Sequence, residues 1–157
     1  MTILSGGQSG VDRAALDVAV ARGLAYGGWC PRGGWAEDLP DPPGLLARYP
    51  HLRATPSRDP AQRTDWNVRD ADAVLIVVDD AGLAASRGTR RAQEKAAAHG
   101  KPCFVADLAD ADVAARAREW LRRVAPEKLG IGGPRESEAP GIYGRAKLFL
   151  ERLFAEP

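Results

Sequence analysis

The sequence is poor in cysteine and histidine and has no long apolar run, and each scarcity excludes a class of protein. Its two cysteines and two histidines lie far apart, so no pair has the spacing of a zinc motif, and no disulfide framework is implied. The longest wholly apolar run, Ala73 to Val78, is far too short to span a bilayer, and the N-terminus lacks the features of a secretion signal. We therefore expect a cytoplasmic protein without a metal site.

Positively and negatively charged residues are nearly equal in number. Lys and Arg number 22 against 21 Asp and Glu, a net charge of +1, so no global field attracts nucleic acid or an anionic membrane. We expect neither as a partner, and any anion must be bound locally. With 45% hydrophobic residues in 157, the chain can bury the core of one domain, which we place at residues 1–157.

Short apolar runs alternate with helical patterns along the chain, which is typical of βα units. We predict an α/β fold, a Rossmann-like open and mostly parallel sheet with helices on both faces. The predicted strands are residues 2–5, 26–30, 52–55, 73–78, 103–106 and 128–131, and the predicted helices are 11–22, 61–70, 89–98, 113–124 and 142–154. Residues 31–56, rich in Pro and Gly, should be mostly loop. The last helix carries a wide apolar stripe, which suits either a subunit interface or deep burial.

A glycine-rich loop follows the first predicted strand. In a parallel sheet ligands bind beyond the carboxyl ends of the strands, so this loop is a candidate site for a phosphate or another oxyanion. Its glycines permit positive φ angles, and successive N–H groups with the start of the next helix can face an anion. The loop consists of Gly6, Gly7, Gln8, Ser9 and Gly10.

The first turn of the following helix adds two charged residues. Ser9 can cap this helix, and Arg13 could reach the same anion as a forked donor. Asp12 is an acceptor suited to a hydroxyl, a ring N–H or a metal ion. An equally good interpretation is that Asp12 and Arg13 are ordinary first-turn residues.

Two common nucleotide motifs are missing. No GxxxxGK[ST] segment is present, which excludes a P-loop, and GxGxxG is also absent. The second predicted strand ends in Trp29, Cys30 and Pro31, where a dinucleotide-binding domain would carry an acidic ribose ligand. NAD is therefore not the expected ligand.

Further polar residues follow other predicted strands or begin helices. Trp35 beside Arg32 could stack on a planar heterocycle, or could anchor the loop in the core. Gly88 and Thr89 begin a helix and offer a second anion cradle. The complete set of candidates outside the first loop and its helix is Arg32, Trp35, Glu37, Arg63, Asn67, Gly88, Thr89, Arg135, Glu136 and Ser137.

Four segments in order, SGGQSGVDR, GGWCPRGGWAEDLP, TDWNVRDADAVLIV and GPRESEAPGIY, resemble the molybdenum cofactor carrier proteins. This family belongs to the Rossmann-fold group of the lysine-decarboxylase-like and lonely-guy proteins. The resemblance covers nearly the whole chain. It implies a homo-oligomer that binds and protects the molybdenum cofactor, a phosphate-bearing pterin, and passes it to molybdoenzymes. The ligand residues it implies are Gly6, Gly7, Gln8, Ser9, Arg13, Arg32, Glu37, Arg135, Glu136 and Ser137.

Two alternative functions would use the same candidate site. Lonely-guy phosphoribohydrolases, which release a base from a nucleoside monophosphate, carry PGGxGTxxE, but Ala92 stands at the glutamate position here. Arg63 matches their arginine, whereas Thr64 replaces the adjacent lysine. The residue that would stabilise an oxocarbenium-like transition state is missing. We therefore favour a carrier without catalytic residues over an enzyme, and a sensor of a nucleotide-derived ligand stays open.

Overall fold

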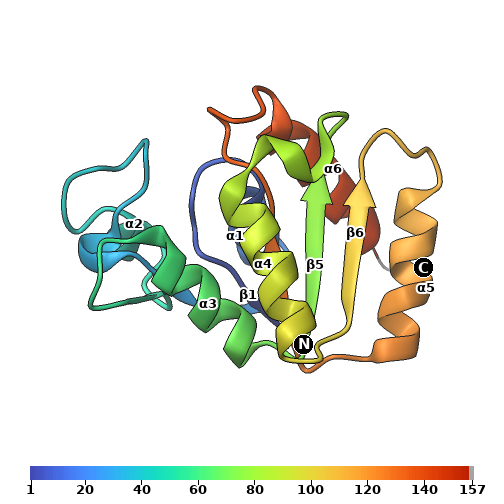
Figure 1. Ribbon diagram of the computed structural model, residues 1–157, viewed down its shortest axis with the longest axis horizontal. Helices are drawn as coiled ribbons and strands as arrows, with labels where there is room; N and C mark the ends of the chain where they lie inside the picture. Colours follow the sequence, from blue (N-terminus) through green and yellow to red (C-terminus); the bar gives the residue numbers. More distant parts are fainter. Residues whose placement is uncertain (156–157) are drawn as a thin grey trace.

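The computed structural model describes residues 1–155 and contains a five-stranded, wholly parallel sheet (Figure 1). Its strand order is β2-β1-β7-β5-β6. The strands are β1 (Thr2–Leu4), β2 (Ala25–Gly27), β5 (Ala73–Val78), β6 (Cys103–Asp107) and β7 (Lys128–Gly132). The predicted Rossmann-like α/β class is confirmed, and the last two residues of the predicted 1–157 domain lie outside the described residues.

Helices cover both faces of the sheet. On one face α1 (Val11–Ala21), α5 (Val113–Val124) and α6 (Ile142–Leu153) bury their apolar stripes in the larger core cluster. On the other, α3 (Pro60–Asp70) and α4 (Arg87–Ala98) pack over β5, whose six residues are all buried. A strand covered on both faces must be apolar throughout, which explains the uninterrupted run of β5.

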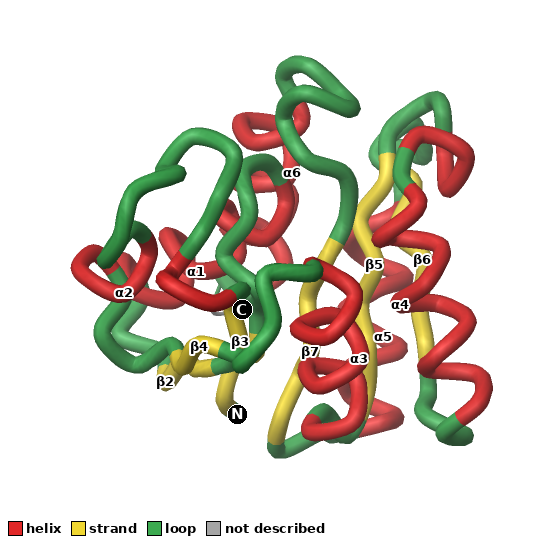
Figure 2. Tube along the Cα trace, turned by 60° about the vertical axis from the view of Figure 1, so that its left-hand side comes forward, coloured by secondary structure: helices red, strands yellow, loops and turns green. Residues whose placement is uncertain are grey.

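The predicted strand over residues 26–30 is wrong as a single strand. It divides into β2 in the main sheet and β3 (Trp29–Cys30), which pairs with β4 (Arg53–Ala54) in a separate two-stranded sheet (Figure 2). The division falls at Gly28, whose φ of 123° is open only to glycine. A turn of the backbone at this glycine directs β3 away from the sheet.

Residues 31–56 are mostly loop, as predicted, with the short helices η1 (Arg32–Gly34) and α2 (Leu45–Arg48). Another short helix, η2 (Gly82–Ala85), precedes α4. The loop region has a small core of its own, in which Leu45, Tyr49 and Leu52 pack with Cys30. This core explains why so long a connection is ordered.

The wide apolar stripe of α6 is explained by packing within the chain. Ile142, Ala146, Phe149, Leu150 and Leu153 are all buried, against α1 and α5. Of the two interpretations of the stripe, deep burial therefore accounts for its width. None of the helices in residues 1–155 is long and apolar enough to cross a membrane.

The strand order creates a topological switch point. From β1 the chain crosses through α1 to β2 at one edge, whereas from β5 it crosses through α4 to β6 at the other edge. Between β1 and β5 lies β7, whose loop leads to α6 on the same face as α1, whereas the loop after β5 leads to α4 on the other face. The loops that leave β7 and β5 therefore diverge on either side of a crevice. Crevices of this kind bind ligands in open α/β sheets.

Candidate functional site

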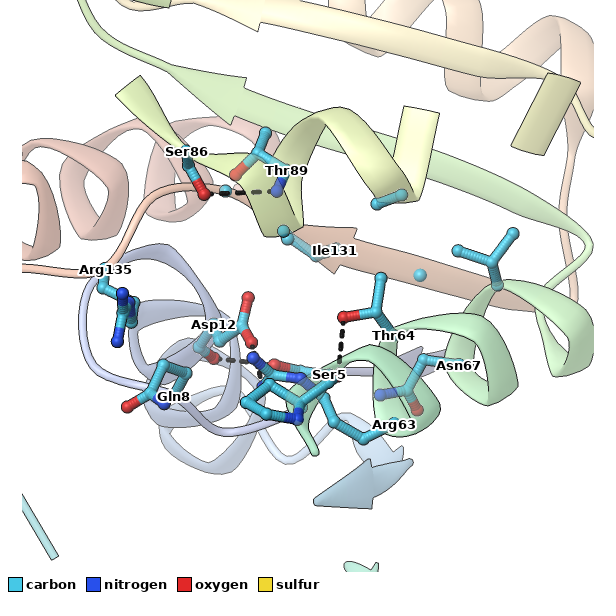
Figure 3. A pocket seen from close by; sticks show the side chains of 18 of the residues that line it. Ser5, Gln8, Asp12, Arg63, Thr64, Asn67, Ser86, Thr89, Ile131 and Arg135 are labelled. Carbon is cyan, nitrogen blue, oxygen red and sulfur yellow. Dashed lines mark hydrogen bonds and ion pairs between the residues drawn. The ribbon is translucent and has the colours of Figure 1, made fainter. Parts of the chain in front are cut away.

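A cleft of about 230 Å³ lies at this switch point, between the loops after β1 and β7 and the helices α3 and α4 (Figure 3). It brings together eight of the candidate residues from four separate segments of the sequence. These are Gly6, Gln8, Asp12, Arg63, Asn67, Gly88, Thr89 and Arg135.

Three residues that line this cleft each carry a buried polar atom without a hydrogen-bond partner within residues 1–155. The atoms are Nε2 of Gln8, Nε of Arg63 and Oγ1 of Thr89, from residues that are 2%, 9% and 3% exposed. A buried polar group without a partner costs about 1 to 3 kcal/mol, so native proteins seldom keep one without a functional reason. Because all three belong to residues around one cleft, this cleft is the candidate site.

Asp12 and Arg63 form a buried ion pair within the cleft. Their Oδ2 and Nη1 atoms are 3.3 Å apart, and both side chains are about nine-tenths buried. Burial raises the pKa of Asp12 above its ordinary value, although Arg63 and the backbone N–H groups of Gln8 and Gly133 oppose the rise. Gly6 permits this packing, because a Cβ at that position would overlap the Arg63 guanidinium.

Two N–H groups of the glycine loop donate to partners within the protein. Gly7 N donates to Ser5 Oγ at 3.3 Å, and Ser9 N donates to Oε1 of Gln8 at 3.0 Å. The loop therefore offers the cleft the side chain of Gln8 and the Cβ-free face of Gly6, rather than the expected row of N–H groups. The loop's own hydrogen bonds thus occupy two of the donors that the sequence analysis assigned to an anion.

Arg13 lies outside the cleft and binds residues of the protein itself. Its Nη1 and Nη2 bind the Asp38 carboxylate at 2.9 and 2.8 Å, and its Nε donates to the carbonyl of Gly7 at 3.1 Å. The Arg13 hydrogen bonds hold the pKa of Asp38 below its ordinary value. The structure thus uses Arg13 to tie α1 to the loop after β3, where the sequence suggested an anion ligand.

Glu37 joins three of the four sequence motifs. Its carboxylate accepts hydrogen bonds from the hydroxyls of Ser9 and Ser137, the latter at 2.6 Å, and lies 3.4 Å from Arg135. Burial raises the pKa of Glu37, but the bonds from Ser137 and Ser9 outweigh it and hold the pKa below its ordinary value. The predicted Ser9 cap is wrong, because Gly10 is the N-cap of α1 and the Ser9 hydroxyl binds Glu37 instead.

Glu136 supports the start of α6. Its carboxylate accepts from the N–H groups of Gly141 and Tyr143, the latter at 2.9 Å, where the helix has free donors. Glu136 and Ser137 line a second, shallower depression beside Arg13 and Glu37. The candidates found there rather than in the cleft are Ser9, Gly10, Arg13, Glu37, Glu136 and Ser137.

Three candidates line neither depression. Arg32 is exposed and Trp35 half-buried on the loop after β3, so no stacking partner for a cleft ligand comes from them. Gly7 faces the small core of the loop region, where a Cβ would contact Leu45 and Leu52. Asn67 does line the cleft, but its amide pairs with the backbone of Trp29 at 2.8 and 2.9 Å.

The start of α4 closes the opposite side of the cleft. Ser86 caps the helix by accepting from the Thr89 N–H at 3.2 Å, and Gly88 and Thr89 line the cleft just beyond this cap. The cap extends the helix to Arg87, two residues before its predicted start. Thr64 and Ala92, at the two positions that distinguish the phosphoribohydrolases, both line the cleft.

Sequence reasoning missed several residues of the cleft. Gly130, Gly132 and Gly133 form its floor along β7, and Glu138 accepts from both the N–H and the side chain of Arg135. The sequence does contain a signal for these residues, because three glycines in and just after a buried strand favour the close approach of a ligand or of another chain segment. Among residues 1–155 no group of three His, Cys, Asp or Glu could hold a metal ion.

Comparisons with known proteins place this arrangement in a family. A family model described as "Circularly permutated YpsA SLOG family" matches residues 3–154. No curated protein matches the chain. The crystal structure of a protein named "Putative molybdenum carrier protein", from Syntrophus aciditrophicus SB, is 35% identical, with a TM-score of 0.88 over 98% of this chain and 94% of that one. The resemblance inferred from the four motifs is thus confirmed, and the chain belongs to the circularly permutated YpsA SLOG family.

Proposed function

We propose that this protein binds and protects a phosphate-bearing small molecule in the cleft, and that the ligand is the molybdenum cofactor. The observation that carries the proposal is the set of three unpartnered buried groups, on Gln8, Arg63 and Thr89. All three can donate a hydrogen bond, so they suit a ligand rich in oxygen acceptors. The name of the similar crystal structure supports a molybdenum-related ligand.

The phosphate suits the α4 side of the cleft. A helix N-terminus attracts an anion, and Arg87 and Gly88 lie there beside the Thr89 hydroxyl. Arg63 adds a buried cation whose one charged partner within residues 1–155 is Asp12. These groups together favour an anion held by side-chain donors and a helix end, without a P-loop.

The ring of the cofactor suits the sheet side of the cleft. Leu4, Val74 and Ile131 supply apolar surface there, next to the glycines of β7. A planar pterin would lie against such a wall, and exclusion of water there would protect its oxidisable metal centre. The cofactor's chemistry is that of its metal-dithiolene group, and the residues described here would bind and shield it.

Carrier function is preferred to hydrolysis because Ala92 puts a methyl group in the cleft where a phosphoribohydrolase needs a carboxylate. A protein that retains its ligand needs no catalytic group. Transfer to a cofactor-free molybdoenzyme would then occur by release from this open cleft. A nucleotide-derived ligand is the rival occupant, since it shares the phosphate and the flat ring.

We also propose that the protein is a homo-oligomer. Leu148 on α6 and Val20 on α1 are 58% and 54% exposed, on two helices that pack together. Exposed apolar side chains of this size suit a subunit contact. Light scattering of the protein and of its Leu148→Glu variant tests this: an oligomer that dissociates in the variant supports the proposal, and a monomeric parent protein contradicts it.

The ligand proposal is tested with cofactor released from a denatured molybdoenzyme. The wild-type protein should prolong the ability of this cofactor to reconstitute a cofactor-free molybdoenzyme, and excess AMP should not displace it. Thr89→Val replaces an unpartnered hydroxyl by a methyl group, so the folded chain should be as stable as before or more so, while cofactor retention falls about tenfold. Unchanged retention in this variant would contradict the site.

Arg63→Met removes the buried cation and should reduce retention about tenfold to a hundredfold, as expected for a hydrogen bond to a charged group. Arg122→Met is the matched control, because Arg122 is exposed on α5 and pairs with Glu119 on the same helix. Equal retention by these two variants would refute the assignment of Arg63. Sub-micromolar binding of AMP in place of the cofactor would favour the nucleotide sensor.

A further inference from the structure

Gln8 has a side-chain amide whose orientation is fixed by its neighbours. Its Oε1 accepts from the N–H of Ser9 at 3.0 Å and from the N–H of Glu37 at 2.9 Å. Two N–H donors must face the oxygen and not the amino group, so the amide cannot be reversed. The amino group Nε2 is left buried without a partner in the described chain. Gln8 can therefore offer a ligand hydrogen-bond donors and no acceptor.

The charges beside Gln8 favour a neutral acceptor over an anion. The Asp12 carboxylate lies near the Gln8 backbone N–H, which favours its charged form and so opposes the rise of its pKa, and it pairs with Arg63 at 3.3 Å. The positive charge of Arg63 is thereby offset where Gln8 lies. An anion brought to Nε2 would meet the buried carboxylate of Asp12, and like charges repel strongly where water is excluded. A ring carbonyl oxygen accepts the same bond without this repulsion.

The two ends of the cleft thus differ in what they bind. Figure 3 shows Gln8 on the side of the glycine loop and Thr89 on the opposite side, at the start of α4. The helix N-terminus and Arg87 suit an anion at the α4 side. A phosphate at that end would leave the ring of the same ligand extending toward Gln8.

Resting on the proposed ligand cleft, we propose that Gln8 selects heterocycles with an oxo group over heterocycles with an amino group at the corresponding position. A ring carbonyl satisfies Nε2, whereas a ring amino group would place one donor against another and leave both buried without partners. A polar site rejects a mismatched analogue far more strongly than an apolar pocket does. The selected class includes pterins and 6-oxopurines and excludes adenine.

IMP and AMP are the probes, because they share ribose and phosphate and differ in the oxo or amino group of the ring. Calorimetry at mildly alkaline pH should show that the wild-type protein binds IMP about tenfold or more tightly than AMP. Gln8→Glu keeps an oxygen to accept from Ser9 and Glu37 and replaces the donor by an acceptor. Because the new carboxylate lies beside Asp12, this variant should be less stable than the wild type, and urea unfolding at the pH of the assay checks that it is folded. The preference for IMP should disappear or reverse.

Gln62→Glu is the matched control. Gln62 on α3 also accepts a backbone N–H through Oε1, from Ser57 at 2.9 Å, and it lies outside the cleft. This variant should keep the preference for IMP.

The inference is overturned if IMP binds no more tightly than AMP, including the case in which neither binds, or if Gln8→Glu keeps the wild-type preference. Protection of the released cofactor is measured separately. If protection is seen without a preference for IMP, the proposed function stands and the role of Gln8 is wrong. If protection also fails, the cleft itself has been misassigned.

Discussion

Gly28→Ala should destabilise the protein strongly, because the backbone passes close to the first strand at this point. The φ of Gly28 is 123°, and a Cβ there would overlap the carbonyl oxygen of Ser5 and lie 2.9 Å from both Ser5 N and Asn67 Oδ1. A backbone conformation open only to glycine costs another residue about 1 to 3 kcal/mol, and overpacking adds about 1 to 3 kcal/mol. Because alanine makes the unfolded chain less flexible than glycine does, the substitution also stabilises the folded state by about 0.4 to 1 kcal/mol, which offsets part of this loss.

The expected net loss is about 3 kcal/mol, which for a chain of this length corresponds to a fall in Tm of about 6 to 12 °C. Urea unfolding and calorimetry measure both quantities. Gly144→Ala is the control, since Gly144 lies in α6 and a methyl group added to its Cα would have no atom within 4 Å. That variant should gain about 0.5 to 1 kcal/mol from helix propensity. A loss below about 1 kcal/mol in Gly28→Ala would refute the close approach of Gly28 to Ser5.

Three further predictions concern charge, the tyrosines and the core. Glu37→Gln should lower the free energy of unfolding by about 1 to 2 kcal/mol at neutral pH. Because folding lowers the pKa of Glu37, its carboxylate stabilises the protein above the ordinary pKa, and this stabilisation is lost as pH falls through the folded-state pKa. The stabilities of the wild type and the variant should therefore converge in acid denaturation curves. Burial and the bond to Asp17 raise the pKa of Tyr143 to about 12, and the same causes raise the pKa of Tyr49. An ultraviolet titration should therefore lose one of two late-ionising tyrosines in Tyr143→Phe, and an unchanged curve would contradict the bond between Tyr143 and Asp17. Leu150→Ala should cost about 2 to 5 kcal/mol in chemical unfolding, whereas Arg152→Ala, at an exposed position of the same helix, should change stability by less than about 0.5 kcal/mol. Equal effects would refute the assignment of the α6 stripe to the core.

Much of the fold could be predicted from the sequence because the strongest signals are local. The run of β5 and the periodic stripe of α5 were predicted with their observed bounds, 73–78 and 113–124. The exchange of strand partners at Gly28 could not be predicted, since it depends on the contact of that glycine with Ser5, distant in sequence. Helix ends shifted by one or two residues wherever a cap such as Ser86 was not identified.

The candidate site was predicted by segment rather than by residue. The glycine loop and the start of α4 do meet at the cleft, as expected from the carboxyl ends of parallel strands. Which side chains face the cleft depends on hydrogen bonds between segments: Arg13 turns away because Asp38 binds it, and Glu37 is occupied by two serine hydroxyls. A single sequence does not indicate whether a charged residue pairs within the protein or with a ligand.

Native mass spectrometry of the wild-type protein incubated with released molybdenum cofactor measures whether the cleft retains this ligand. We expect one cofactor mass retained per chain in the wild type and about tenfold lower retention in Thr89→Val, with the fold of the variant intact by circular dichroism. A wild-type spectrum that contains only the mass of the free chain, or equal retention by both proteins, would contradict it.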